Sequence, residues 1–361
     1  MDILWFVLGL ALMIAGAEVL VRGASRTAVM MGISPLVVGL TVVAFGTSAP
    51  EFAVSLKAAY AGQASICVGN VIGSNIFNIL FILGLSAIIV PLVVSPQLIR
   101  FDLPLVILVS IIVFAMSLDG NIGRIDGIIL FSGLLAYTVS AIYGSRKAGK
   151  AIIGSPSPES LSSPTPFSIR ALAINLALMV VGLTLLVMGA NWLVDTAVRF
   201  AIWMNVSELV IGLTIVSIGT SLPEVVTSIV AGLKGERDIA VGNVVGSNLF
   251  NLLGVLGLSA AVSPLGIDVS DQAIRLDMPI MVMVAIAALP VLFTRRLVSR
   301  SEGVALLLYY VVYTIFLILN VIGDPRADIV SAGVLYVALP ITALVLVIRS
   351  AQWAKTSAAA S

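Results

Sequence analysis

Eleven apolar runs of about 20 residues dominate this chain and leave it few ways to fold. A helix of that length crosses a hydrocarbon layer roughly 30 Å thick. Hydrophobic residues make up 60% of the sequence and charged residues 10%, well below the roughly 25% of a soluble domain. An all-α polytopic membrane protein is therefore predicted, with spans near 3–21, 34–56, 67–91, 103–118, 126–143, 170–192, 206–232, 240–262, 278–294, 303–322 and 329–348.

Two long motifs within these runs occur twice, at a single offset of 173 residues. GLTVVAFGTSAPE at 39–51 returns as GLTIVSIGTSLPE at 212–224, and VGNVIGSNIFNILFILG at 68–84 returns as VGNVVGSNLFNLLGVLG at 241–257. Each repeated unit covers five spans. Because five is odd, the second unit must enter the membrane in the opposite orientation. We expect two inverted five-helix repeats with ten core helices, a common architecture of secondary transporters, plus an additional eleventh helix.

The longest polar segment, 144–168, separates the two units. Four prolines lie in it among serines and glycines, a composition typical of a flexible linker. The expected parts are a first repeat at 1–143, this linker, a second repeat at 169–322, and the extra span with its tail at 323–361.

The basic residues indicate an orientation, because cytoplasmic loops hold an excess of Lys and Arg. If loops alternate between the two faces, one face collects 14 of the 19 basic residues. That face is expected to be cytoplasmic, which places the N-terminus outside and the linker and C-terminus inside. The basic residues on this face are Arg22, Arg26, Arg100, Arg146, Lys147, Lys150, Arg170, Lys234, Arg237, Arg295, Arg296, Arg300, Arg349 and Lys355.

Net charge and the missing histidine narrow the function classes. A formal net charge of +1 gives no basic field for nucleic acid. Without His, the chain lacks the usual zinc and copper ligands and the Ser-His and Cys-His catalytic pairs. Cys67 stands alone, so it is interpreted as a buried structural thiol. We expect neither an enzyme nor a bound cofactor. The expected partners are the lipid bilayer and small ions, and the sequence does not indicate an oligomeric state.

The first repeated motif predicts a helix broken inside the membrane. Pro50 removes one backbone hydrogen bond and clashes with the preceding turn. Ser48 followed three residues later by Glu51 has the pattern of a capping box, which would start a second half-helix. Ser221 and Glu224 repeat the pattern. Carbonyl groups freed by such a break must face protein or a polar cavity, where a cation can use them.

Glu51 and Glu224 are the main candidates for ion binding. An ionised carboxylate deep in a bilayer costs several kcal/mol, and no basic residue lies in the central part of these spans to pair with either one. Helix capping alone is therefore the weaker interpretation. Carboxylates with nearby hydroxyls and carbonyls form an all-oxygen set that suits Ca²⁺ and Na⁺. The hydroxyls flanking the glutamates are Thr47, Ser48, Thr220 and Ser221.

The second repeated motif supplies further polar groups on one helical face. Asn70, Ser74 and Asn78 recur every four residues, and Asn243, Ser247 and Asn251 mirror them in the second copy. Two other asparagines of the motif point elsewhere on the helix and are expected to join helices by hydrogen bonds. These are Asn75 and Asn248. The G-x-x-x-G spacing in both copies predicts close helix packing, at Gly69 with Gly73 and at Gly242 with Gly246.

These paired motifs resemble those of the cation/calcium exchanger superfamily, in particular its prokaryotic sodium/calcium exchanger-like members. The resemblance covers about residues 5–322. It implies that ions bind between the broken helices two and seven and helices three and eight, with Glu51 and Glu224 as the central ligands. The motif positions imply the rest of the site at Thr47, Ser48, Ser74, Asn78, Thr220, Ser221, Ser247 and Asn251, and at the carbonyls of Ala44 and Ser217.

The resemblance implies Na⁺/Ca²⁺ antiport by alternating access, in a prokaryotic inner membrane. H⁺/Ca²⁺ exchange stays open because burial favours the neutral form of a carboxylate. K⁺-dependent exchange and a cation channel are further alternatives. Well-studied relatives carry an aspartate at one of the positions matched by Asn78 and Asn251. Here both are asparagine, so one Ca²⁺ would neutralise the two glutamates whereas three Na⁺ would leave the site at +1. The exchange ratio and the direction of transport stay open.

Overall fold

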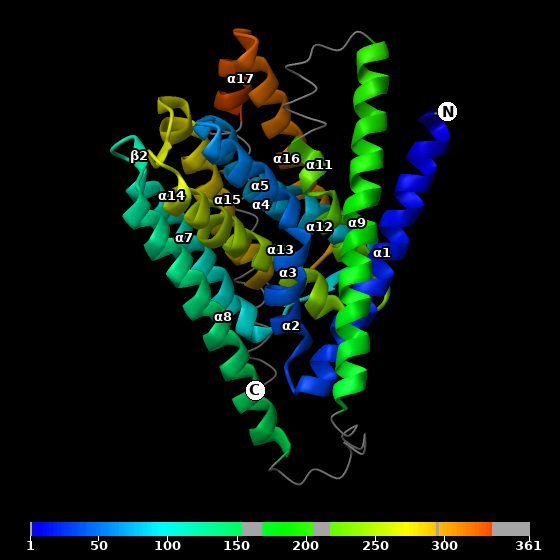
Figure 1. Ribbon diagram of the computed structural model, residues 1–361. Helices are drawn as coiled ribbons and strands as arrows, with labels where there is room; N and C mark the ends of the chain where they lie inside the picture. Colours follow the sequence, from blue (N-terminus) through cyan, green and yellow to red (C-terminus); the bar gives the residue numbers. More distant parts are fainter. Residues whose placement is uncertain (1, 154–167, 205–216, 294–295, 334–361) are drawn as a thin grey trace, which may run out of the picture.

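The computed structural model describes residues 2–153, 168–204, 217–293 and 296–333, which form a bundle of long helices (Figure 1). Eight of the described helices are long and apolar enough to cross a membrane, and a bent pair of helices makes a ninth span. The chain is thus a polytopic helical membrane protein. Of the other two expected spans, 206–232 is described only from residue 217 and 329–348 only to residue 333; the remainder of each lies outside the described residues.

The first half of the chain contributes five spans, and π-helical segments, labelled η, interrupt two of them and begin a third. The helices and π-helical segments are α1 (Asp2–Met31), α2 (Pro35–Val38), η1 (Gly39–Val43), α3 (Ala44–Thr47), α4 (Ala49–Tyr60), α5 (Ala64–Phe77), η2 (Asn78–Ile82), α6 (Leu83–Ile89), η3 (Leu98–Asp102), α7 (Leu103–Met116) and α8 (Arg124–Ile153).

The second half follows the same order. Its elements are α9 (Ile169–Trp203), α11 (Ser217–Thr220), α12 (Leu222–Leu233), α13 (Arg237–Leu249), η5 (Phe250–Leu256), α14 (Gly257–Val262), η6 (Ala273–Asp277), α15 (Met278–Phe293), α16 (Arg300–Val321) and α17 (Arg326–Gly333). Three helices clearly exceed their expected lengths, and the first of them, α1, continues past residue 21 to Met31. α8 continues past residue 143 into the segment expected to be a linker, and α9 continues past residue 192. The rest of the linker, 154–167, lies outside the described residues.

Four two-residue strands tie the halves together through their interhelical loops. β1 (Leu92–Val93) pairs antiparallel with β4 (Leu297–Val298), and β2 (Asn121–Ile122) pairs antiparallel with β3 (Ile267–Asp268). Each ribbon takes one strand from each half. The strands β1 and β3 occupy equivalent places in their halves, as do β2 and β4, so the two ribbons are equivalent contacts made twice.

The helices α1 and α9 lie side by side at one edge of the bundle (Figure 1). A Cβ added at Gly16 would lie 2.7 Å from the carbonyl oxygen of Gly182, and one added at Gly9 would lie 2.9 Å from that of Gly189. Only glycine permits such an approach of two backbones. Since the residue numbers run in opposite directions along the contact, the two helices are antiparallel.

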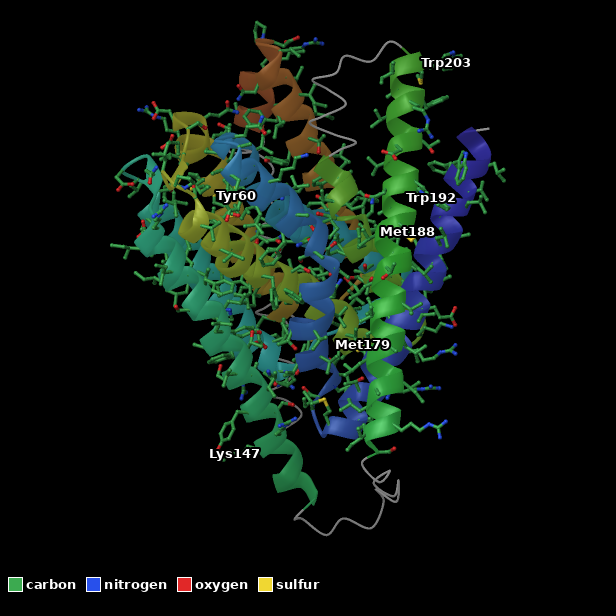
Figure 2. All side chains as sticks on the ribbon, viewed as in Figure 1. Tyr60, Lys147, Met179, Met188, Trp192 and Trp203 are labelled. Carbon is green, nitrogen blue, oxygen red and sulfur yellow. The ribbon has the colours of Figure 1, made fainter. Side chains whose placement is uncertain are left out.

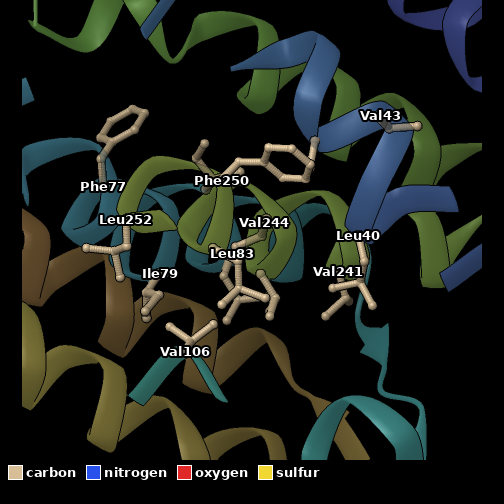
Figure 3. Close-up of a cluster of buried hydrophobic side chains, with 14 of the residues drawn as sticks. Leu40, Val43, Phe77, Ile79, Leu83, Val106, Val241, Val244, Phe250 and Leu252 are labelled. Carbon is tan, nitrogen blue, oxygen red and sulfur yellow. The ribbon is translucent and has the colours of Figure 1, made fainter. Parts of the chain in front are cut away.

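The third and eighth spans form the centre of the molecule. In the span Arg237–Val262, 100% of the residues in its apolar stretch are buried, and in the span Ala64–Ile89 the buried share is 72%. In the other continuous spans this share is 11% to 44%. Their apolar side chains pack together and against α7 and the bent second span. Figure 3 shows this cluster, which includes Leu40, Phe77, Ile79, Leu83, Val106, Val241, Val244, Phe250 and Leu252. Polar side chains on these two spans therefore lie deep in the protein.

The ends of the spans agree with the alternation expected from the sequence. Figure 2 places Tyr60 and Trp203 toward one end of the molecule and Lys147 at the opposite end. The N-terminus lies near the end that holds Trp203 (Figure 1). The linker side of the bundle is thus opposite to the N-terminus.

Candidate ion-binding site

The second span breaks at Ser48, as the sequence predicts. The helix Pro35–Thr47 and the helix Ala49–Tyr60 meet at an angle of 49°. Pro50 lies in the first turn of α4, where its missing N–H leaves no helical bond unmade. In the second half, Ser221 interrupts the chain between α11 and α12 in the same way.

The capping boxes predicted at these breaks do not form, and this prediction is wrong. Neither Ser48 nor Ser221 makes a side-chain hydrogen bond to the helix that it precedes. Instead, Ser48 Oγ donates to Glu224 Oε1 at 3.0 Å, and Ser221 Oγ donates to Glu51 Oε1 at 2.7 Å. A carboxylate is a stronger acceptor than a neutral group. Each serine therefore holds the glutamate of the other half.

Both glutamates are fully buried, with an exposed fraction of 0%. Their second oxygens, Glu51 Oε2 and Glu224 Oε2, have no hydrogen-bond partner, and no salt bridge within the described part of the chain involves either residue. A buried carboxylate without a positive partner is strongly disfavoured. Two such groups, held by mirrored contacts, make a place where a cation would be stabilised.

Hydroxyl groups from both halves surround the carboxylates. Thr220 lies beside Glu51, while Thr47 and Ser247 lie beside Glu224. Ser74 Oγ lies 3.2 Å from Ser221 Oγ and is the donor of this second bond, because the single hydroxyl proton of Ser221 goes to Glu51. The structure therefore brings to the glutamates all six of the hydroxyl residues that the sequence singles out: Thr47, Ser48, Ser74, Thr220, Ser221 and Ser247.

The two expected amide ligands, Asn78 and Asn251, are buried on the neighbouring spans. Asn78 Nδ2 donates to Asn248 Oδ1 at 3.0 Å, which leaves Asn78 Oδ1 without a partner. Neither side-chain polar atom of Asn251 has a partner within the described residues. Several side-chain oxygens of the candidate ligands thus have no partner among the described residues, and such a set matches the preference of hard cations. They are Glu51 Oε2, Glu224 Oε2, Asn78 Oδ1, Ser247 Oγ and Asn251 Oδ1.

The carbonyl oxygen of Ala44, expected as a backbone ligand together with that of Ser217, already takes part in hydrogen bonding. The carbonyl oxygen of Ala44 accepts from the Ser48 amide at 3.0 Å, whereas Thr47 Oγ1, 3.3 Å from this oxygen, lies closer to Asn243 Oδ1, at 3.0 Å. It is thus engaged within its own broken helix. Ser217 is the first residue of α11, and its side chain lies outside the described atoms.

Asn70 and Asn243 fix the positions of the glutamates. Asn70 Nδ2 donates to Ser55 Oγ at 2.9 Å and to the Glu51 carbonyl at 3.3 Å. Asn243 Nδ2 makes the same bonds to Ser228 Oγ at 3.0 Å and to the Glu224 carbonyl at 3.3 Å. These asparagines lie on the helical face expected to contact the ion. The sequence reasoning missed Ser55 and Ser228, although they recur at the offset of the motifs.

The other two motif asparagines differ from each other. Asn248 links two spans by accepting from Asn78, as expected. Asn75 instead donates to the carbonyl of Val71 in its own helix, at 2.7 Å. The expected close packing at Gly242 is present, since a Cβ there would lie 2.7 Å from the Leu36 carbonyl oxygen. At the equivalent Gly69, no described atom lies within 4 Å of such a Cβ.

Both amide candidates lie in π-helical segments. Asn78 is the first residue of η2, and Asn251 is the second residue of η5. A π-helical turn places more residues in each turn than an α-helix does, which rotates the side chains that follow. Such turns occur frequently at functional sites. The sequence carries no local signal for them.

Among the described residues, the carboxylates at the candidate site are those of Glu51 and Glu224. Within the described ranges, no three residues of the His, Cys, Asp and Glu types come close enough to hold a metal ion together. The remaining ligands available here are hydroxyl, amide and carbonyl oxygens.

Broken membrane helices that bring buried carboxylates together are typical of secondary ion transporters. The comparisons with known proteins agree with that class. A family model described as sodium/calcium exchanger protein matches residues 1–143 and 174–319. The chain belongs to this family of cation antiporters.

Among the relatives, a putative antiporter, CaxA, of Alkalimonas amylolytica is 38% identical over 86% of this chain and 96% of its own length. The inner membrane protein YrbG of Escherichia coli is 39% identical over 84% of this chain and 91% of its own length. A solved structure of the sodium-calcium exchanger NCX_Mj superposes with a TM-score of 0.72 at 29% identity, over 86% of this chain and 97% of that one.

Proposed function

We propose that this protein exchanges Na⁺ for Ca²⁺ by alternating access around Glu51 and Glu224. The observation that carries the proposal is the pair of crossed hydrogen bonds. Each glutamate is held through one oxygen by a serine of the other half, and each keeps its second oxygen free. An ion bound by the free oxygens would contact both halves of the chain at once.

The remaining ligands of the proposed site are oxygens of both halves. Hydroxyl and amide oxygens complete the coordination that two carboxylates begin, because Ca²⁺ takes six to eight oxygen ligands. The proposed ligands beside the glutamates are Thr47, Ser48, Ser74, Asn78, Thr220, Ser221, Ser247 and Asn251, with the carbonyls of Ala44 and Ser217. The carbonyl of Ala44 would join them through its second lone pair, beside the hydrogen bond from the Ser48 amide.

We further propose that the fold consists of two inverted five-helix repeats, at 1–143 and 169–322, with a linker at 144–168 and an eleventh span within 323–361. The antiparallel contact of α1 with α9 and the two equivalent β-ribbons support this arrangement. The two segments matched by the family model agree with the same division. Inverted repeats suit alternating access because one repeat can rock against the other around a fixed site.

The membrane orientation is proposed from the basic residues. The N-terminus would face outward and the linker would face the cytoplasm, in agreement with the positive-inside rule. An inner-membrane relative supports placement in a prokaryotic inner membrane. In this orientation, sodium moving inward down its gradient would drive calcium outward.

H⁺/Ca²⁺ exchange is the second candidate function. Its support is the burial of two carboxylates without a basic partner, because such groups can carry protons as well as metal ions. Only a measurement with imposed gradients separates the two coupling ions. A channel is less favoured, because the crossed contacts between the two broken helices leave both glutamates fully buried instead of facing an open path.

Replacing either glutamate by glutamine tests the role of the site. Glu51→Gln and Glu224→Gln are expected to abolish ⁴⁵Ca²⁺ flux in proteoliposomes, because each removes one of two charges that hold the ion. The proteins should still fold, since glutamine keeps the shape and accepts the same serine hydrogen bond. Asp271→Asn, at an exposed carboxylate, serves as the control and should retain flux. Wild-type flux in either glutamine variant would remove the central role of the site.

A further inference from the structure

A second polar cluster lies one helical turn beyond Glu51. Ser55 follows the glutamate by four residues on α4, Cys67 lies on α5, and Ser259 lies on α14. The Cys67 thiol lies beside the hydroxyls of both serines. All three side chains have an exposed fraction of 0%. None of them belongs to the ion ligands described above.

The second half contains the equivalent cluster beyond Glu224. Ser228, Ala240 and Ser86 occupy the places that correspond to Ser55, Cys67 and Ser259 at the offset of the repeats. The helices meet in the same way, since α14 contacts α4 and α6 contacts α12. The one chemical difference is alanine in place of cysteine.

Two hydroxyls at equivalent positions in these clusters have no partner. Ser86 Oγ and Ser259 Oγ are buried and make no hydrogen bond within the described part of the chain. Buried hydroxyls are nearly always bonded, because leaving one unsatisfied destabilises the fold. An unsatisfied hydroxyl, present once in each half, can be bonded by a water molecule or by a passing cation.

A polar stripe connects the first cluster to the ion site. Asn78, Ser74, Asn70 and Cys67 follow one another at intervals of three or four residues along α5 and η2. Asn70 is half-buried, whereas the equivalent Asn243 is fully buried. In this structure the stripe on α5 is therefore more accessible at Asn70 than the second half is at the equivalent Asn243.

The two clusters lie on opposite sides of the glutamates. Beyond Ser55, α4 ends at Tyr60, toward the end of the molecule that also holds Trp203 (Figure 2). Beyond Ser228, α12 ends at Leu233, and the next residue, Lys234, bonds Glu18 of α1 at 2.7 Å. Two residues later, Glu236 accepts from Ser25, so the end of α12 lies beside the C-terminal half of α1, the half away from the N-terminus.

We propose that cations reach the glutamates through two pathways, which we call branches. The first branch runs between Glu51 and the membrane face at the end of α4 and is lined by Ser55, Cys67 and Ser259. The equivalent second branch runs from Glu224 to the opposite face and is lined by Ser228, Ala240 and Ser86. The ligand is the transported hard cation, and the hydroxyl oxygens replace part of its hydration shell. Both branches are closed in this structure, since their side chains are buried. The inference rests on the proposed transport function.

Cys67 provides the test without any engineering, because it is the only cysteine in the chain. Native protein in oriented membrane vesicles is treated with membrane-impermeant methanethiosulfonate reagents, one carrying a trimethylammonium group and one a sulfonate. We expect the cationic reagent to modify Cys67 from one face only, faster than the anionic reagent. Saturating Na⁺ or Ca²⁺ is expected to slow this reaction, whereas choline is not.

Two variants in a Cys67→Ala background serve as controls. Ala240→Cys moves the thiol to the second branch and is expected to react from the opposite face. Ala285→Cys places a thiol on α15 at a position that is 1% exposed and lies outside both clusters, and it is expected to stay unmodified. A further variant, Glu51→Gln, is expected to remove the preference for the cationic reagent at Cys67.

The branch assignment is overturned if Cys67 stays unmodified in every ionic condition, reacts equally from both faces, or reacts equally with both reagents. ⁴⁵Ca²⁺ flux is measured on the same vesicles. Normal flux with an unreactive Cys67 would remove the branch and leave the transport function intact. Absent flux in native protein, with Cys67 still modified from one face by the cation, would remove the calcium function and leave the branch intact.

Discussion

Each glutamate of the site depends on a serine from the other half of the chain. The Ser221–Glu51 and Ser48–Glu224 bonds join residues 170 and 176 positions apart. A hydrogen bond to a charged group contributes about 1.5–3 kcal/mol, and here it also fixes which carboxylate oxygen stays free for an ion. The two serines are therefore positioning residues as well as candidate ligands.

Removing these hydroxyls should weaken ion binding without unfolding the protein. Ser221→Ala and Ser48→Ala are each expected to lower the apparent Ca²⁺ affinity about tenfold, since 1.4 kcal/mol corresponds to a factor of ten. The measurement is the Ca²⁺ dependence of flux in proteoliposomes. Ser95→Ala, in a loop away from the site, is the control. An unchanged affinity in both variants would contradict the crossed hydrogen bonds.

The two amide candidates, Asn78 and Asn251, are neutral and add no charge to that of the two glutamates. Asn251→Asp adds a third carboxylate, so we expect an apparent Ca²⁺ affinity about tenfold higher, from Coulomb attraction partly offset by desolvation. Asn251→Leu removes the oxygen and should lower the affinity instead. Flux titrations with Ca²⁺ measure both effects. If the two substitutions change the affinity in the same direction, Asn251 does not face the ion.

Repetition made the residue types of the site predictable, while their partners were not. The glutamates and hydroxyls stand out because they recur at one offset inside apolar runs. The capping pattern at Ser48 predicts a local bond, yet the side chain bonds the distant Glu224. A local sequence pattern indicates only which hydrogen bonds a residue can make within its own helix. A carboxylate from another element accepts more strongly than the local partners do, so Ser48 bonds Glu224 instead.

At the scale of elements, the proline-marked break was predictable and the π-helical turns were not. Pro50 has a direct steric consequence for the helix that contains it. The segments η2 and η5 arise where two central spans pack on all sides, and no residue in them forbids an ordinary α-helix. The sequence therefore does not predict that Asn78 and Asn251 lie in π-helical segments.

The glycine contact between α1 and α9 should tolerate no side chain. In Gly16→Leu the new Cβ would meet backbone atoms of α9 at 2.7 Å, so the two helices must separate. We expect a loss of about 1–3 kcal/mol of stability, seen as a lower thermal unfolding midpoint, together with reduced Ca²⁺ flux. Gly144→Leu, where no described atom lies within 4 Å, is the control and should leave both unchanged. Equal midpoints for the two variants would contradict the close packing.

At the scale of the whole molecule, the proposed arrangement of two inverted repeats follows from the number of spans expected in each repeat. An odd number of spans per repeat predicts opposite orientations, and the antiparallel α1–α9 contact and the paired ribbons are contacts that such an arrangement would make. The ribbons themselves could not be predicted, because a two-residue strand has no periodicity to detect. The lengths of α1, α8 and α9 were also underestimated, since these helices continue past the ends expected for the membrane spans.

The most direct test of sodium-coupled calcium exchange is ⁴⁵Ca²⁺ uptake by proteoliposomes of purified protein under imposed gradients. An outward Na⁺ gradient, with equal pH on both sides, is expected to drive uptake into the vesicles, and Glu51→Gln is expected to abolish it. A proton gradient without sodium is expected to drive none. Calcium uptake that follows the proton gradient and ignores the sodium gradient would contradict the proposed coupling ion, and uptake that needs neither gradient would contradict exchange itself.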